Sequence, residues 1–206
     1  MSGEKPVAVY ERRVRASAER VWENVRDWEH LPSLHHEAFA SIECEEAGLW
    51  GWRAKIHSTQ GPEAIRLELM IDDADSSYHS RTIEGPGTGT DIFTRVAPVS
   101  DELTDVRVEF FVPGLDAETG ARQGERFVRL YTQLWDEDEG MMQARQAFLD
   151  GSSAGVARAG SRTRTPLGPA AELHAVGSRI VSVEGEPFRV VSRDGALFAH
   201  TTVCPH

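Results

Sequence analysis

The sequence has little cysteine, no excess of positive charge and no long apolar run. Only Cys44 and Cys204 occur in 206 residues, too few for the disulfide framework of a small secreted domain. We expect Cys44 to pack as a small apolar residue, without a Cys44–Cys204 disulfide, in a reducing cytoplasm. Residues 1–6 lack the apolar segment of an export signal. Together these absences favour a cytoplasmic location.

The charge balance excludes two classes of partner. Acidic residues outnumber basic ones by 33 to 22, and the net charge is −11. Nucleic acids and anionic membranes both select for basic surfaces, so we expect neither as a partner. No apolar run approaches the ~20 residues that a membrane-spanning helix needs. Hydrophobic residues still make up 40% of the chain, enough for a packed core.

The order of predicted elements indicates an α+β domain. A strand over residues 7–14 precedes a helix capped by Ser17 and a short helix from Trp28 to about Leu34. A run of strands then ends in a long helix over 125–149. Alternating apolar residues and turn signals place these strands at residues 42–45, 50–56, 65–71, 78–84, 90–99 and 106–112.

The long predicted helix carries one acid on its apolar face. Its stripe runs from Phe127 to Leu149 in steps of three and four. At about 100° per residue, Asp138 lies near the middle of that stripe, whereas its acidic neighbours at 136, 137 and 139 are predicted to face solvent. A carboxylate in an apolar interior needs a cation or a hydrogen-bond donor. Arg145, on the same stripe, is one candidate partner.

The C-terminal part differs in composition. Residues 151–172 are rich in Gly, Ser, Ala, Arg and Pro and are predicted to be a linker. Three short strands are then expected at 179–183, 188–192 and 196–201, and Cys204-Pro205-His206 follows them. We therefore divide the chain into a domain over 1–150, a linker over 151–172 and a small all-β part over 173–206.

The first domain resembles the START/SRPBCC superfamily over roughly residues 7–150. The resemblance rests on element order and on the segment Val21-Trp22-Glu23-Asn24-Val25-Arg26-Asp27-Trp28-Glu29-His30-Leu31-Pro32. It implies the helix-grip fold, in which a curved antiparallel sheet wraps around a long C-terminal helix and encloses an apolar cavity. Because this fold hosts carriers, cyclases, receptors and oxygenases, it does not by itself specify a function.

The C-terminal part resembles the first half of a Rieske 2Fe–2S domain. In such domains one Cys-x-His and one Cys-x-x-His hold the cluster, and only the first pair, Cys204 and His206, is present. The resemblance implies that these two residues would bind a 2Fe–2S cluster only together with a missing C-terminal half. We therefore expect residues 173–206 to be a truncated domain.

The two resemblances together point to Rieske non-haem iron oxygenases. In their catalytic domains the motif Asn-x2-Asp-x2-His-x4-His and a distal Asp surround one iron, and Asn24, Asp27, His30 and His35 stand at these spacings. The resemblance implies Fe(II) held by His30, His35 and Asp138, with Asp27 linking the iron to the cluster. In oxygenase α subunits the Rieske domain comes first, whereas here the order is reversed.

Two functions therefore remain open. One is an oxidoreductase that uses Fe(II) and oxygen on an apolar substrate, with an electron-transfer partner and possible assembly into a homo-oligomer. The other is a START-like carrier or sensor that binds a hydrophobic small molecule without catalysis. In that second case the two histidines have helix-end or cavity-lining roles, and Asp138 is part of a buried ion pair.

Overall fold

The computed structural model describes residues 5–157, 166–183, 186–193 and 195–201. Contacts divide the chain into two compact units, and the boundary between Ala144 and Arg145 falls within the longest helix. Cys204 and His206 lie outside the described residues, so the predicted cluster ligands have no structural description. Among the helices of the described ranges, none has the length and apolar character needed to cross a bilayer.

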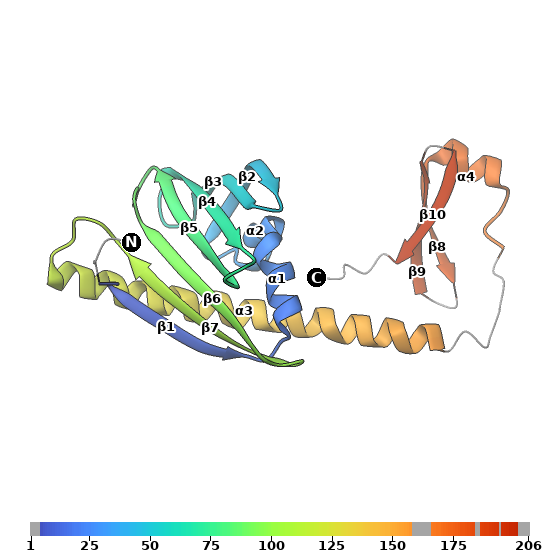
Figure 1. Cartoon of the computed structure of the whole chain (residues 1–206). Coiled ribbons are helices and arrows are strands. Elements are labelled where there is room, and N and C mark those ends of the chain that lie inside the picture. The colour runs from blue at the N-terminus through green and yellow to red at the C-terminus, as the bar shows by residue number, and fades with distance from the viewer. Residues whose placement is uncertain (1–4, 158–165, 184–185, 194, 202–206) are drawn as a thin grey trace. The chain divides into compact units, whose positions relative to one another are not determined.

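A seven-stranded antiparallel sheet forms most of the first unit (Figure 1). The strands from β2 to β7 follow one another as a meander, and β1 returns to pair with β7, which gives the order β1-β7-β6-β5-β4-β3-β2. The strands are β1 (Ala8–Val14), β2 (Phe39–Gly48), β3 (Gly51–Ser58), β4 (Ala64–Asp72), β5 (Ser77–Glu84), β6 (Asp91–Ser100) and β7 (Leu103–Phe111). The predicted α+β helix-grip architecture is confirmed.

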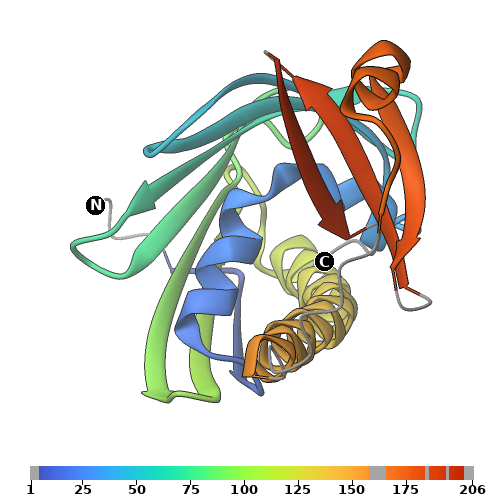
Figure 2. The same cartoon turned by 90° about the vertical axis from the view of Figure 1, so that its right-hand side faces the viewer.

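Helices cover the concave side of this sheet. Between β1 and β2 the chain forms α1 (Ala18–Arg26), the 3-10 helix η1 (Trp28–His30) and α2 (Leu31–Leu34). After β7 it forms α3 (Ala117–Ala157). Figure 2 looks almost along α3 and shows the sheet curving around it, with α1 alongside. Register shifts in β2 contribute to this curvature, because a bulge bends the strand that carries it.

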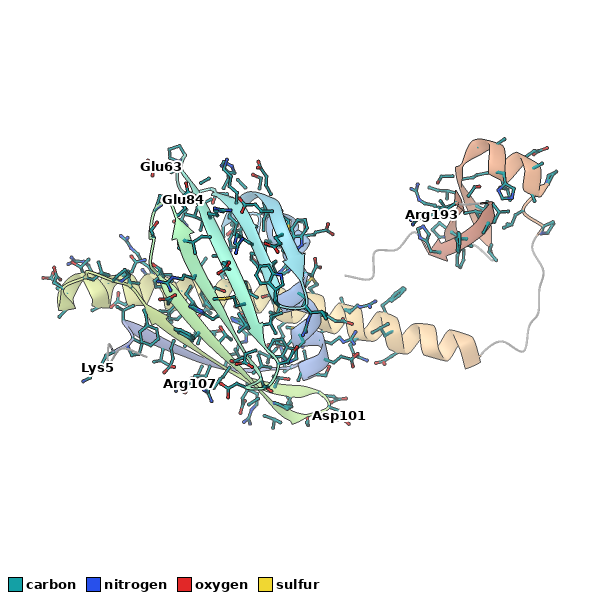
Figure 3. All side chains as sticks on the ribbon, turned by 45° about the horizontal axis from the view of Figure 1, so that its top comes forward. Lys5, Glu63, Glu84, Asp101, Arg107 and Arg193 are labelled. Carbon is teal, nitrogen blue, oxygen red and sulfur yellow. The ribbon has the colours of Figure 1, made fainter. Side chains whose placement is uncertain are left out.

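Alternation along the strands separates the two faces of the sheet. On β7, Val106, Val108 and Phe110 are buried. Arg107, labelled in Figure 3, lies between them in the sequence and is exposed. Its side chain pairs with Glu11 of β1. A strand side chain can reach the core only at every second position, so this pattern follows from the sequence. The apolar face of the sheet packs against α1 and α3.

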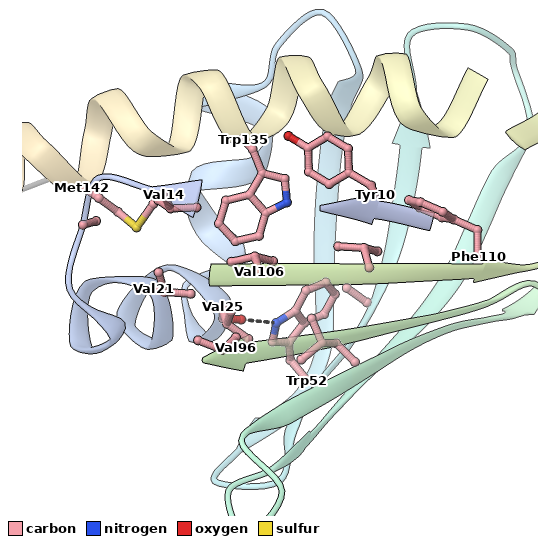
Figure 4. Close-up of a cluster of buried hydrophobic side chains, with 14 of the residues drawn as sticks. Tyr10, Val14, Val21, Val25, Trp52, Val96, Val106, Phe110, Trp135 and Met142 are labelled. Atoms are coloured by element: carbon pink, nitrogen blue, oxygen red, sulfur yellow. Dashed lines mark hydrogen bonds between the residues drawn. The ribbon is translucent and has the colours of Figure 1, made fainter. Parts of the chain in front are cut away.

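The core lies between the sheet and the helices α1 and α3 (Figure 4). Val21 and Val25 enter it from α1, and Trp135 and Met142 enter it from α3. Trp52 of β3 is buried among them, and its indole N–H donates a 3.1 Å hydrogen bond to the Val25 carbonyl. Trp52 of β3 therefore belongs to the core.

Several boundaries differ from those predicted, and two of them have a local explanation. The long helix begins at Ala117 and not near Glu125, because the Asp116 carboxylate accepts a hydrogen bond from the Thr119 N–H and satisfies a free donor of the first turn. The strand predicted at 42–45 extends to Gly48, and the β2–β3 hairpin turns at Leu49–Trp50, since Gly48 still pairs with Gly51.

The second unit contains a separate three-stranded antiparallel sheet. A short helix, α4 (Ala170–Val176), precedes the strands β8 (Ser178–Val183), β9 (Glu186–Arg193) and β10 (Ala196–Thr201). The three predicted strands are confirmed. The interval predicted to be a linker contains the end of α3, which continues to Ala157, and the beginning of α4.

Candidate metal centre and cavity

Two successive turns after α1 place the histidines. Ser17 caps the start of α1, and its Oγ accepts a hydrogen bond from the Arg20 N–H. This helix ends at Asp27, whose carboxylate caps η1 by accepting from the Glu29 N–H at 3.1 Å. His30 is the last residue of η1, and His35 is the C-cap of α2. Both imidazole rings are buried, so two polar side chains lie in the interior of the first unit.

Both imidazoles donate from Nδ1 and keep Nε2 for another partner. The Nδ1 of His30 contacts the backbone carbonyl of Asp27, and the Nδ1 of His35 lies 2.6 Å from Oε2 of Glu137 on α3. A carbonyl and an ionised carboxylate can only accept, so the Nδ1 of each ring carries the proton. In the neutral rings, each Nε2 therefore presents a lone pair.

Asp138 faces these two lone pairs. Its Oδ1 lies 3.0 Å from Nε2 of His35 and 3.5 Å from Nε2 of His30. Although these atoms are close, Oδ1 is fully buried and accepts no aligned hydrogen bond. One nitrogen of each ring and one carboxylate oxygen lie within 4.8 Å of one another. Three converging lone pairs repel one another unless a cation, or additional protons on the rings, lie between them.

Protonation is coupled across this cluster. Burial lowers the pKa of His35, but the nearby carboxylates of Asp138 and Glu137 outweigh this effect and hold that pKa above its ordinary value. Burial raises the pKa of Asp138, yet the nearby imidazoles of His30 and His35 outweigh this effect and bring that pKa below its ordinary value. The carboxylate is therefore ionised at neutral pH, as a metal ligand must be.

The residue types and spacings suit a divalent transition metal. Two neutral imidazoles and one carboxylate are the donors of the facial triad that binds Fe(II). The carboxylate oxygen of Asp138 lies 3.0 Å from Nε2 of His35 and 3.5 Å from Nε2 of His30, so the three donor atoms converge on one point. The unsatisfied Oδ1 of Asp138 could accept from either a cation or a proton on Nε2 of a ring.

A cavity of about 140 Å³ opens beside the cluster, between the sheet and α3. Its walls are mainly apolar and include Trp52, Ile56, Leu67, Leu69, Ile92 and Trp135. The lining also includes Asn24, whose side-chain oxygen is buried without a hydrogen-bond partner. The cavity thus combines an apolar wall with a free acceptor.

Two tyrosines complete the polar side of the cavity. Burial raises the pKa of Tyr78 to about 12, a hydrogen bond with Thr94 acts in the opposite direction, and the charge of Asp138 raises it further. Burial, and then the charges of Tyr78 and Asp138, also raise the pKa of Tyr131. Both phenols are neutral at physiological pH, so they can donate hydrogen bonds but do not act as phenolate ligands.

The site residues predicted from sequence fall into three groups. His30, His35 and Asp138 lie together, and Asp138 is buried as its position on the helix predicted. Asp27 lines the cavity, where its carbonyl holds His30 and its carboxylate caps η1, while its link to a cluster stays a prediction. Cys204 and His206 lie outside the described residues, and His36, which follows the ligand candidate His35, is exposed.

The prediction that the acids flanking Asp138 face solvent is wrong at two positions. Glu139 is buried and pairs with Arg12 and Arg15, and Glu137 is only partly exposed because it contacts His35. Four consecutive helical residues span about 300° of the helix circumference, so a helix covered on more than one side must bury several of them. This geometric signal was available in the sequence, but it does not identify the partners.

Comparison with known proteins supports the fold. No protein-family model and no curated protein matches this chain. The Zhui aromatase/cyclase from Streptomyces sp. R1128 has a TM-score of 0.54 at 15% identity, with 67% of this chain and 93% of that chain covered. A START superfamily protein from Mycobacterium smegmatis has a TM-score of 0.52 at 18% identity, with 65% and 97% covered.

A third solved structure agrees with these two. A point mutant of norcoclaurine synthase from Thalictrum flavum has a TM-score of 0.51 at 20% identity, with 67% of this chain and 94% of that chain covered. At such low identities the likeness extends to the fold alone. The seven-stranded sheet wrapped around α3 is thus the helix-grip fold found in structures of the START/SRPBCC superfamily.

Proposed function

We propose that the first unit binds a small hydrophobic molecule in the cavity between the sheet and α3. The observation that carries this proposal is the apolar wall around about 140 Å³ of space. An apolar cavity of about 150 Å³ is large enough for benzene, so a ligand with one aromatic ring is of the right size. The free oxygen of Asn24 favours a ligand that also carries a hydrogen-bond donor.

Titration with a matched pair of probes tests this proposal. Toluene and p-cresol have similar size, but only p-cresol can donate a hydrogen bond to Asn24. Trp52 and Trp135 line the cavity, so their fluorescence should change on binding. We expect both probes to bind, with p-cresol favoured by about 2- to 12-fold, the equivalent of a hydrogen bond worth about 0.5–1.5 kcal/mol.

Two variants give this titration its controls. Asn24→Leu should abolish the preference for p-cresol. Ile92→Trp should fill part of the cavity and weaken binding of both probes. If the wild-type protein shows no saturable response to either probe, the binding proposal is wrong.

A second candidate function rests on a different observation. The convergence of His30, His35 and Asp138 supports an oxidoreductase in which these residues hold Fe(II) beside the cavity. Bound iron of this kind supplies oxygen-activating chemistry. The chain's own residues would orient the imidazoles through Asp27 and Glu137, and the apolar wall would exclude water from the substrate.

The Rieske resemblance extends this second candidate. Cys204 and His206 would contribute to a 2Fe–2S cluster once a Cys-x-x-His pair is supplied from further sequence, and Asp27 would lie on the path to the iron. An external electron donor would then be required. This candidate and the binding proposal are independent, since a hydrophobic ligand can occupy the cavity with or without a metal.

Measuring the iron content of the protein tests the metal site on which the second candidate function depends. Protein purified and loaded anaerobically with Fe(II) should retain about one equivalent of iron, and His30→Ala should lose it. His36→Ala is the matched control, because His36 is exposed and should leave iron binding unchanged. Wild-type protein that retains no iron would exclude the metal site but leave the binding proposal standing.

A further inference from the structure

The two imidazoles of the cluster are held by different kinds of partner. His30 donates to the backbone carbonyl of Asp27, a neutral acceptor, whereas His35 donates to the Glu137 carboxylate at 2.6 Å. A carboxylate behind a ligating imidazole fixes its tautomer and increases the basicity of the nitrogen that faces the metal. The two rings are therefore unequal as potential ligands.

We propose that Glu137 is a positioning residue that holds His35 as an Nε2 ligand and strengthens binding of a divalent cation by the cluster. This inference rests on the metal site of the second candidate function. Glu137 does not reach the proposed metal position, since its Oε2 contacts the opposite nitrogen of the ring. Its effect on the cation is transmitted through His35.

The charges of the cluster support this assignment. Asp138 is buried, and the side chain of Glu137 is 27% exposed. Together they supply two negative charges, which balance one divalent cation between neutral imidazoles. A buried site with matched charges avoids the large penalty for an uncompensated ion. The acceptor behind His30 is an uncharged carbonyl, whereas the acceptor behind His35 is the Glu137 carboxylate.

A side-chain clamp fixes the Glu137 carboxylate. Oε2 accepts from His35, and Oε1 accepts from Nε2 of Gln133 at 3.1 Å. The same amide group of Gln133 donates to Glu37, just before β2, at 3.0 Å. Both oxygens of Glu137 are therefore engaged, and α3 is connected to the turn that carries His35. A carboxylate held at both oxygens has little freedom to rotate away from the ring.

The competing interpretation is a simple structural ion pair. Glu137 and His35 would then stabilise the packing of α3 without affecting a metal. The two interpretations differ in what a neutral substitution does to the cation. A structural pair affects the melting temperature of the metal-free protein, whereas a positioning residue also affects the affinity for the metal and its ligand-field spectrum.

Cobalt(II) is a suitable probe because its visible absorption reports ligand geometry and it needs no oxygen-free handling. We expect Glu137→Gln to weaken Co(II) binding by about 10- to 100-fold and to alter the visible spectrum. Asp136→Asn is the matched control, because it removes an equal charge from the adjacent residue, whose carboxylate pairs with Arg12 at 2.5 Å. We expect that variant to retain the wild-type spectrum and an affinity within about twofold of wild type.

A second variant tests the clamp while leaving the carboxylate in place. Gln133→Met removes the hydrogen bonds to Glu37 and Glu137, and we expect a smaller loss of Co(II) affinity than for Glu137→Gln. If Glu137→Gln binds Co(II) within threefold of wild type and with an unchanged spectrum, the positioning role is wrong. If wild-type protein binds no Co(II), the metal site itself is wrong, and the inference fails with it.

Discussion

Replacement of Trp52 by phenylalanine tests whether the end of α1 depends on a single side chain of the sheet. The indole N–H donates to the Val25 carbonyl at 3.1 Å, and the tryptophan is only 5% exposed. Val25 lies in the last turn of α1, where carbonyls lack partners within the helix. Phenylalanine keeps an aromatic ring but leaves this carbonyl buried without a donor.

The expected effect has two contributions. A buried acceptor left without its hydrogen bond destabilises the fold by about 1–3 kcal/mol. The smaller ring also leaves space beside an existing cavity, which adds about 1 kcal/mol. We therefore expect the free energy of unfolding of the Trp52→Phe variant to fall by about 2–4 kcal/mol. Because α1 leads into the turn that positions His30, the affinity for Co(II) should also fall.

Urea denaturation followed by circular dichroism at about 222 nm measures this change without relying on tryptophan fluorescence. Trp50→Phe is the matched control. Trp50 is half-buried before β3, with Arg53 over its ring, and the same chemical change there should alter stability by less than about 1 kcal/mol. Equal losses in the two variants would refute the argument that the Val25 hydrogen bond is the dominant contribution.

Three further predictions concern α3. A Cβ on Gly124 would lie 2.5 Å from the carbonyl oxygen of Val7. Gly124→Ala should therefore destabilise the fold by about 1–3 kcal/mol, despite the better helix propensity of alanine. Thermal unfolding measures this loss. Gly140→Ala meets no atom within 4 Å and should instead stabilise by about 0.5–1 kcal/mol; a loss there would contradict the packing argument. Burial raises the pKa of Glu139, but hydrogen bonds from Arg15 and Arg12 outweigh burial and bring that pKa below its usual value. The ionised Glu139 carboxylate therefore stabilises the fold at neutral pH, and this stabilisation is lost as the pH falls through the lowered pKa. Glu139→Gln should therefore unfold more easily than wild type at pH ~7, with the difference shrinking in acid, and a difference independent of pH would exclude this carboxylate as the cause.

Local patterns were sufficient for much of the fold. Ile65, Leu67, Leu69 and Ile71 alternate, and the strand β4 contains all four. The angular position of Asp138 on a helix likewise predicted its burial, because both periods follow from backbone geometry alone. The resemblance of the histidine segment to a known motif placed two imidazoles near one another. These predictions needed no knowledge of what lies across the interface.

Partners across the interface could not be predicted in the same way. Glu137 and Glu139 flank Asp138, and the sequence predicted that both face solvent. In the structure Glu137 contacts His35, whereas Glu139 pairs with two arginines near the end of β1. The helix period states which direction a side chain points, but not which element lies there. That depends on the curvature of the sheet and on the close approach of α3 to β1 at Gly124.

The sequence by itself thus determined the order of elements, the faces of strands and helices, and the residue types available for a buried site. Only the tertiary structure decided that Nδ1 of each histidine is already engaged, that Nε2 of each faces Asp138, and that one ring has a carboxylate behind it. The physical reason is that periodicity and propensity act within a few residues, whereas Asp138 and His35 meet only after a seven-stranded sheet has closed around α3.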